Sequence, residues 1–184
     1  MTEGPARIFV PVCKQPLDPN YRDTWQWRTA NYVGVCGGRV GTALESSHCG
    51  GYRTDGVLYP ESGVRIADIR DGTSNTVAVG EQVNWLRVWT AGAYTTQSVK
   101  PWRHVCVFPA KNVAWPINTD PVERRYNHAR PDQNCLFNDI FFSSYHPNGC
   151  NFVWADGSVR FVQETIDMEI LKSLSTRDGG EVTP

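Results

Sequence analysis

The residues of this chain whose types and spacing could support catalysis or metal binding lie near its C-terminus, where nine residues separate His146 from Asp156. An imidazole beside a carboxylate can act as a general base or ligate a metal ion. Ser143 and Ser144 precede His146, so a serine-hydrolase triad is one hypothesis for this stretch. Residues this close on one segment rarely converge on a single point, and no Gly-x-Ser-x-Gly motif accompanies them. We therefore expect no catalytic residues and no enzymatic activity.

A second group of polar side chains lies within residues 55–81, around the run Asp-Gly-Thr-Ser-Asn. Carboxylate and amide oxygens are the ligands that Ca²⁺ prefers in proteins, although their spacing here is not that of an EF-hand loop. The commoner explanation is a turn whose side chains bond the local backbone. Calcium stays an alternative, and no other cofactor is expected. The candidate ligands are Asp68, Asp71, Asn75 and Glu81.

The six cysteines are the third chemical feature, and no Cys-x-x-Cys pair occurs among them. Zinc sites usually bring their ligands in close pairs, so disulfides are favoured over zinc, with buried thiols as a further alternative. Spacing favours Cys36 with Cys49 and Cys106 with Cys135. Because disulfides persist outside the cytosol, this interpretation predicts an exported protein, in the periplasm or on the cell surface.

Aromatic residues are spread through the middle of the chain, residues 84–142, where prolines repeatedly interrupt any regular element. Amphipathic rings dominate many glycan and protein contacts. This region therefore supports an alternative function, an envelope binding module or accessory subunit that recognises a glycan or a partner protein. The competing explanation is that the rings fill the core of a loop-rich domain. The candidates are Trp85, Trp89, Tyr94, Trp102 and Trp115.

The element that must position His146 is a β-hairpin, predicted by the Asp-Gly pair at residues 156–157 between two alternating runs. With a two-residue loop, Phe152 faces Phe161 and Trp154 faces Val159. These four side chains are then expected on one face of the ribbon, directed toward the core.

A short amphipathic helix is expected after Thr165, because the apolar period changes there from two to about 3.6. Thr165 or Asp167 can cap its start. Extending the hairpin register places His146 opposite Asp167, which predicts a structural hydrogen bond. Metal ligation with Asp156 or Asp167 is the alternative. The apolar side of the helix comprises Ile166, Ile170, Leu171 and Leu174.

Length and composition favour one globular domain over residues 1–184, which have 40% hydrophobic and 20% charged residues. A net charge of −1 argues against a nucleic-acid partner. Strands are expected over residues 31–36 and 76–82, with further candidates at 105–108 and 136–142. The predicted fold is α+β, an antiparallel, loop-rich sheet with a C-terminal hairpin and helix. Within it we expect an irregular N-terminal wrap (1–30), an insertion-like region (84–142) and a signature hairpin and helix (143–184).

The motif His146, nine residues, Asp156-Gly157 stands in the sequence FSSYHPNGCNFVWADGSVRFVQETID. This stretch resembles the C-terminal module of a bacterial prepilin-like family that is named for the pattern. The upstream segment VRIADIRDGTSNTVAVGE is similar to the second signature of the same family. The two occur in the expected order and together cover roughly a third of the chain.

The resemblance implies a pseudopilin-like protein, a non-enzymatic structural component of the cell envelope that packs into a filament or a larger complex. Its expected partners are the same or related pilin-like chains, or other envelope subunits. Family members begin with a prepilin leader and a long apolar helix. Residues 1–12 lack such a run, and nothing later reaches the ~18 apolar residues of a membrane span. Membrane contact is therefore expected only through an N-terminal helix missing from this chain or through a partner.

Overall fold

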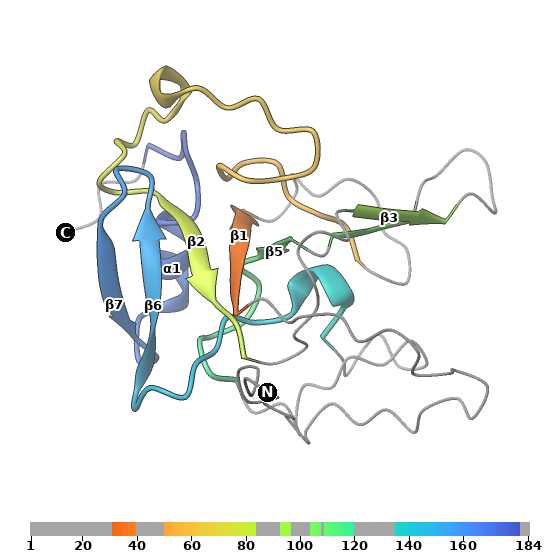
Figure 1. Ribbon diagram of the computed structural model, residues 1–184. Coiled ribbons are helices and arrows are strands. Elements are labelled where there is room, and N and C mark those ends of the chain that lie inside the picture. The colour runs from red at the N-terminus through yellow and green to blue at the C-terminus, as the bar shows by residue number, and fades with distance from the viewer. Residues whose placement is uncertain are drawn as a thin grey trace, which may run out of the picture.

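The computed structural model describes residues 31–39, 50–83, 93–96, 104–107, 109–119 and 135–180, with backbone alone for 93–96 and 104–106. The chain in these ranges is mostly β, and one short helix follows the last strand (Figure 1). The elements in order are β1 (Tyr32–Gly37), the 3-10 helix η2 (Ile66–Asp68), β2 (Val77–Glu81), β3 (Ala93–Thr96), β4 (His104–Val107), β5 (Ala110–Asn112), the 3-10 helix η4 (Phe137–Asp139), β6 (Gly149–Trp154), β7 (Val159–Gln163) and α1 (Met168–Ser173).

Five strands form one sheet in the order β5-β1-β2-β6-β7, and β3 and β4 pair as a separate antiparallel ribbon. Figure 1 shows the five strands side by side, with β7 at one edge. Three of the four pairings in the sheet are antiparallel, and β1 pairs with β5 in parallel. The expected α+β fold with a C-terminal hairpin and helix is confirmed, and the parallel strand β5 is an addition to it.

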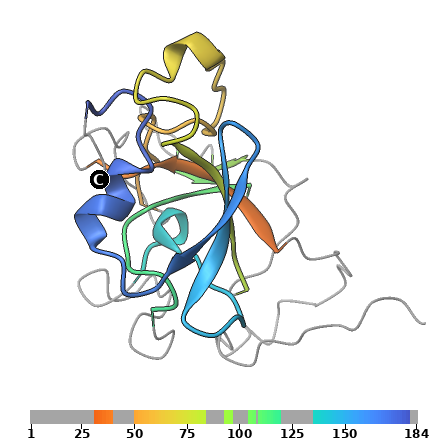
Figure 2. The same cartoon turned by 90° about the vertical axis from the view of Figure 1, so that its left-hand side faces the viewer.

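The main core lies between the inner face of the sheet and α1, which stands beside the β6–β7 hairpin (Figure 2). Asp167 caps this helix, because its carboxylate accepts hydrogen bonds from the Glu169 and Ile170 N–H groups. Leu171 is the fully buried residue of α1. The core residues are Val33, Val35, Val77, Val113, Ile117, Phe142, Cys150, Phe152, Trp154, Val162 and Leu171.

The hairpin loop is one residue longer than predicted. The Trp154 N–H donates to the Ser158 carbonyl at 2.8 Å, and the Gly157 N–H donates to the Trp154 carbonyl at 3.0 Å. Gly157 has φ 84°, the left-handed conformation that closes a type I turn with a G1 bulge. Residues 155–157 therefore form a three-residue loop, and the predicted two-residue loop is wrong.

This longer loop shifts the register by one position. Phe152 faces Arg160, and Phe161 faces Asn151. Because side chains alternate along a strand, a one-residue shift moves every side chain of β7 to the other face. Val159 and Phe161 are consequently 64% and 46% exposed, and Val162 takes the core position. The expected burial of Val159 and Phe161 is therefore wrong.

The cysteines whose side chains the structure describes are buried, and none forms a disulfide. Cys36 and Cys135 each lie in an apolar cluster. The predicted pairs Cys36–Cys49 and Cys106–Cys135 are thus not formed, while Cys49 and the Cys106 side chain lie outside the described residues. Burial raises the pKa of the Cys36 and Cys150 thiols to about 12. The three cysteines described therefore give no support to the expectation of export, which rests on the family resemblance.

We expect native protein to leave Cys36 and Cys150 unmodified by iodoacetamide at mildly alkaline pH, because only the exposed thiolate reacts at a useful rate. Both residues should become modified after unfolding in guanidinium chloride. Peptide mass spectrometry with and without denaturant measures the difference. A peptide cross-linked through either residue in a non-reducing digest would contradict the prediction.

No helix within the described ranges has the length and apolar character needed to cross a bilayer.

Candidate functional site

Glu81, the last residue of β2, joins the two sequence signatures. Its side chain is one-tenth exposed, and Oε2 accepts hydrogen bonds from the Asn151 N–H at 2.7 Å and the Asn151 Nδ2 at 3.3 Å. Oε1 lies 3.4 Å from His146 Nε2 and accepts a hydrogen bond from the Tyr32 hydroxyl at 3.3 Å. Burial, reinforced by the Glu81 carboxylate, raises the pKa of the Tyr32 hydroxyl. One carboxylate therefore bonds three different segments of the chain.

The strand registers explain why these residues meet. Tyr32 pairs with Glu81, and Asn151 pairs with Phe161. The β2–β6 pairing of Gly80 with Phe152 sets Glu81 beside Asn151. Antiparallel partners present their side chains on the same face. One row across four strands therefore reads Tyr32, Glu81, Asn151, Phe161.

A second row lies beside the first on the same face. It consists of Gly34, Val79, Val153 and Val159, which are paired in this order across the four strands. We call the two rows together the outer face of the sheet, since the opposite face covers the main core. Val79 and Val153 are half-buried, and Val159 is exposed. The outer face is thus mainly apolar and aromatic, with the Glu81–Asn151 pair in its first row.

The turn before β6 brings His146 back over the first row. The Ser144 hydroxyl accepts the His146 N–H at 3.0 Å and donates to the Gly149 carbonyl at 2.6 Å. Asn148 adopts a left-handed φ of 66°, which closes the turn. The imidazole then meets the Phe161 ring edge-on, with 6.4 Å between ring centroids. The side chain of His146 stays 56% exposed.

This arrangement orients His146 and supplies a carboxylate beside it. The Ser144 hydroxyl, however, is engaged with backbone groups and not with the imidazole. The expected position of His146 opposite Asp167 is not observed, because Asp167 caps α1 and Glu81 contacts the imidazole instead. His146 is therefore a surface residue whose position is fixed by contacts with Ser144, Glu81 and Phe161.

Replacing His146 with alanine should lower the free energy of unfolding by about 0.5–1 kcal/mol, because a half-exposed contact with Glu81 and Phe161 is lost. Chemical denaturation measures the change. Tyr145→Ala is the control, since Tyr145 is 63% exposed and should change stability by no more than about 0.5 kcal/mol. Equal stability of His146→Ala and the unmodified protein would contradict the structural role.

Asp156 and Gly157, the other residues of the motif, lie at the opposite end of the hairpin from His146. The Asp156 carboxylate accepts the Ser158 N–H at 2.8 Å and lies 3.7 Å from Arg160. Hydrogen bonding to Ser158 lowers the pKa of Asp156. The spacing of His146 and Asp156 is therefore the length of one strand, and the two side chains have separate roles.

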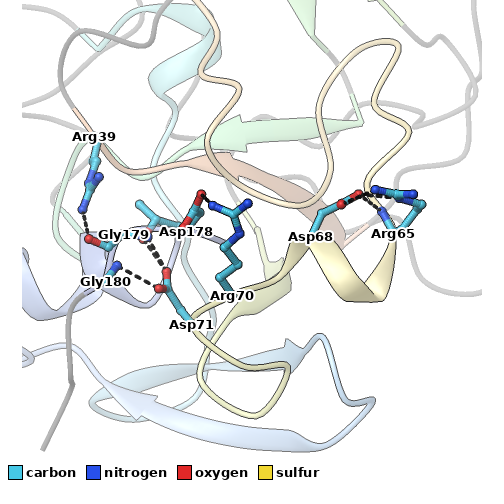
Figure 3. A network of polar contacts seen from close by, with 9 residues as sticks. Arg39, Arg65, Asp68, Arg70, Asp71, Asp178, Gly179 and Gly180 are labelled. Atoms are coloured by element: carbon cyan, nitrogen blue, oxygen red, sulfur yellow. Dashed lines mark hydrogen bonds and ion pairs between the residues drawn. The ribbon is translucent and has the colours of Figure 1, made fainter.

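The calcium candidates are likewise dispersed. Asp71 binds the C-terminal segment (Figure 3): Oδ2 accepts the Gly179 N–H at 2.6 Å and the Thr176 hydroxyl at 3.3 Å, and Oδ1 accepts the Gly180 N–H at 2.8 Å. The Asn75 side chain donates to the Asp71 carbonyl at 3.0 Å. These contacts are turn and tail bonding, the commoner of the two interpretations.

Asp68 makes a separate contact with Arg65, which donates to both carboxylate oxygens (Figure 3). These hydrogen bonds lower the pKa of Asp68 to about 2. Glu81 lies on the outer face, as described above. Over the ranges that the structure covers, no group of three or more His, Cys, Asp or Glu side chains is placed to hold a metal ion.

The C-terminal tail is also bonded through Arg177 and its neighbours. The Arg177 carbonyl accepts the Arg70 N–H at 2.6 Å. The Arg177 guanidinium donates to the carbonyls of Thr54 and Gly56. Arg70 adds an ion pair with Asp178 at 2.9 Å. The tail therefore holds the second signature against the segment that follows β1.

Of the aromatic candidates, Trp115 is the one whose side chain the structure describes. It is half-buried and packs against the cluster of Cys135, Phe137, Ile140 and Phe141. This supports the core interpretation at that position. Tyr94 lies in β3, where the backbone alone is described, and Trp85, Trp89 and Trp102 lie outside the described residues.

Sequence reasoning missed a buried polar network around Lys111 of β5. Lys111 is 2% exposed, and its Nζ donates to the carbonyls of Val107 at 2.6 Å and Phe137 at 2.9 Å. The ammonium also lies 3.7 Å from the centroid of the Phe137 ring. Nearby, the Asn112 amide donates to Asp139 Oδ1 at 2.7 Å, while burial raises the pKa of Asp139. Nothing in the triplet Ala-Lys-Asn signals a buried lysine, because the burial depends on tertiary contacts such as the Phe137 carbonyl, 26 residues away.

Together these contacts define a class of protein, a mostly β domain with a C-terminal hairpin. The turn before the hairpin, which carries His146, and the polar tail after it are bonded to the upstream signature. Residues 9–169 match the family SBP_bac_10, described as "Protein of unknown function (DUF1559)", and the chain belongs to that family. It is a bacterial family that is often associated with prepilin-type N-terminal cleavage proteins. The resemblance found in the sequence is confirmed at that level. No curated protein and no solved structure matches the chain significantly.

Proposed function

We propose that this protein is a non-enzymatic structural component of the bacterial cell envelope, a pseudopilin-like domain that packs with other protein chains into a filament or larger complex. In this proposal it acts outside the cytosol, in the periplasm or at the cell surface. Family membership supports the setting, since the family is often associated with prepilin-type proteins.

The observation that carries the proposal is the outer face of the sheet. Tyr32, Val159 and Phe161 are 54%, 64% and 46% exposed there, Tyr32 on β1 and the other two on β7. Contiguous apolar patches on a soluble domain usually mark a contact surface. Exposed side chains in rows across a sheet suit a protein partner better than a small molecule, because small ligands are bound in concave pockets.

The Glu81–Asn151 pair strengthens this interpretation. The Glu81 carboxylate is satisfied within the chain by Tyr32, His146 and Asn151, so it offers a partner an ordered surface rather than an unpaired charge. Interface centres favour aromatic residues and disfavour unpaired charges, for which the desolvation cost is high. The first row therefore has the composition of an assembly contact.

The test uses the full-length protein in its native host, with the photo-cross-linking residue p-benzoylphenylalanine in place of Phe161. We expect adducts with envelope proteins, with pilin-like chains among them, identified by mass spectrometry after cell fractionation. The control carries the same residue in place of Ile66, which is 76% exposed in η2 and belongs to neither row of the outer face. Recovery of the protein only from the cytosolic fraction, or no adducts from position 161, would overturn the proposal.

A further inference from the structure

We propose that a second copy of this chain adds to the sheet along the edge of β7, in an antiparallel pairing with two-fold symmetry about Val162. This inference rests on the proposed assembly function and names both the surface and the partner. Strand β7 is the last strand of the five-stranded sheet, and α1 follows it in the chain. The edge that β7 presents is the left-hand border of the sheet in Figure 1.

The hydrogen-bond pattern determines which groups of β7 face outward. The Ser158 carbonyl accepts from Trp154, and the Glu164 N–H donates to Asn148, so even-numbered residues bond inward to β6. Inward and outward groups alternate along an antiparallel strand. The N–H and C=O groups of Val159 and Phe161 therefore point away from the sheet. Among the described residues, no hydrogen bond to these groups is formed.

Strand β7 also lacks several of the features by which proteins protect a sheet edge, although it carries one charged residue, Arg160. Such edges usually carry a proline, a lysine or a β-bulge that prevents pairing with another chain. The sequence of β7 is Val-Arg-Phe-Val-Gln, and its pairing with β6 is regular throughout. Val159 and Phe161, whose side chains are exposed, are also the residues whose backbone groups are available for a further strand.

Two charged residues at this edge favour a second copy of the chain as the partner and determine the register of the strand pairing. Arg160 and Glu164 project on the same face of the strand, two positions on either side of Val162. In an antiparallel pairing centred on Val162, Arg160 of each copy lies opposite Glu164 of the other, twice by symmetry. The same register sets Phe161 opposite Gln163 of the second copy, so outward backbone groups meet outward groups.

The groups needed for these ion pairs are accessible. The Arg160 side chain is 48% exposed, and its ion pair with Asp156 within the chain is a long one of 3.7 Å. Glu164 is half-buried, and the Asn118 amide bonds its Oε2 at 2.8 Å. Because the symmetry axis runs perpendicular to the sheet, the outer faces of the two copies become one continuous surface, with Phe161 of each copy near its centre.

Charge reversal tests this register. Arg160→Glu and Glu164→Arg each set like charges opposite one another, so each variant alone should weaken self-association on the order of tenfold or more. The double variant Arg160→Glu/Glu164→Arg should restore it. An equimolar mixture of the two single variants should also associate, because opposite charges then face each other at both contacts, but only in the mixed pair. Sedimentation velocity over a range of concentrations measures each case.

Arg65→Glu is the matched control, since it changes the net charge by the same amount at an exposed position just before η2, outside β7, and should leave association unchanged. Circular dichroism and thermal unfolding show whether each variant is folded. Association that neither single reversal weakens would overturn the β7 pairing but leave the assembly function standing on another surface. A protein that sediments as a monomer in every variant also overturns the pairing, and adducts from position 161 with other envelope chains would then keep the assembly function.

Discussion

Replacing Lys111 with methionine is expected to lower the free energy of unfolding by about 2–4 kcal/mol. Methionine retains the apolar length of the side chain but removes the ammonium. The buried carbonyls of Val107 and Phe137 then lose the donor that lies 2.6 and 2.9 Å away. Each buried polar group left without a partner costs about 1–3 kcal/mol. Chemical denaturation with a constant m-value provides the measurement.

Lys172→Met is the matched control for this experiment. Lys172 lies on α1 and pairs with Glu169, whose side chain is 80% exposed, so its removal should cost no more than about 0.5 kcal/mol. If Lys111→Met were as stable as Lys172→Met, the Lys111 network would not be a determinant of the fold. The variant also tests whether η4 depends on this lysine, since Phe137 belongs to η4.

Replacing Glu81 with alanine is expected to destabilise the protein by about 2–4 kcal/mol, because a buried carboxylate that accepts from Asn151, Tyr32 and His146 is lost. The Asn151 N–H loses its acceptor, and the contacts that join Tyr32 and Asn151 across the first row are removed. Glu81→Gln should cost less, since one oxygen can still accept the Asn151 N–H. Urea denaturation of the three proteins gives the order.

Glu169→Ala provides the comparison for the same chemical change at an exposed position, with an expected loss of no more than about 0.5 kcal/mol. We expect Glu81→Gln to keep Tyr32 and Phe161 in place and Glu81→Ala to loosen the row between them, because only glutamine retains an acceptor for the Asn151 N–H. A cross-link from position 161 that persists in Glu81→Gln but weakens in Glu81→Ala would support the assembly surface. It would show that partner binding depends on the fixed positions of the side chains in the first row as well as on their exposed area. Equal stability of Glu81→Ala and Glu169→Ala would contradict the role of Glu81 described here.

The two signatures of the family have a physical explanation in this structure. Asp71 from the upstream signature holds the tail through Gly179 and Gly180, and Glu81 from the same signature holds the turn that carries His146. The spacing between His146 and Asp156 is the length of β6 and the start of its loop. The motif therefore marks residues that build the hairpin, its loop and the turn before it.

Several elements could be predicted from the sequence because local chemistry determines them. An Asp-Gly pair between alternating runs favours a hairpin, and Asp167 directly before an amphipathic stretch is a preferred helix N-cap. The strands expected over 31–36 and 76–82 are β1 and β2 within a residue or so. Turn bonding around Asp71 also followed from residue type.

The tertiary structure decided what local chemistry leaves open. The segment Ala-Asp-Gly suits a two-residue or a three-residue loop, and the difference moves Phe161 from the core to the outer face. Residues 136–142, expected as a strand, contain the 3-10 helix η4 instead, because Asn138 bonds the Val107 N–H and the Gly50 carbonyl. Both outcomes depend on partners that are distant in the sequence.

The chemistry-bearing residues divide in the same way. The sequence by itself determined that His146 stands near a hairpin, that Asp156 belongs to its turn, and which family the two signatures indicate. Only the tertiary structure showed that His146 meets Glu81 rather than Asp167, and that Cys36 and Cys135 are buried thiols rather than disulfide partners. Turns and caps are determined by residues a few positions apart. The pairing of side chains across a sheet depends on strand register, which the whole domain sets.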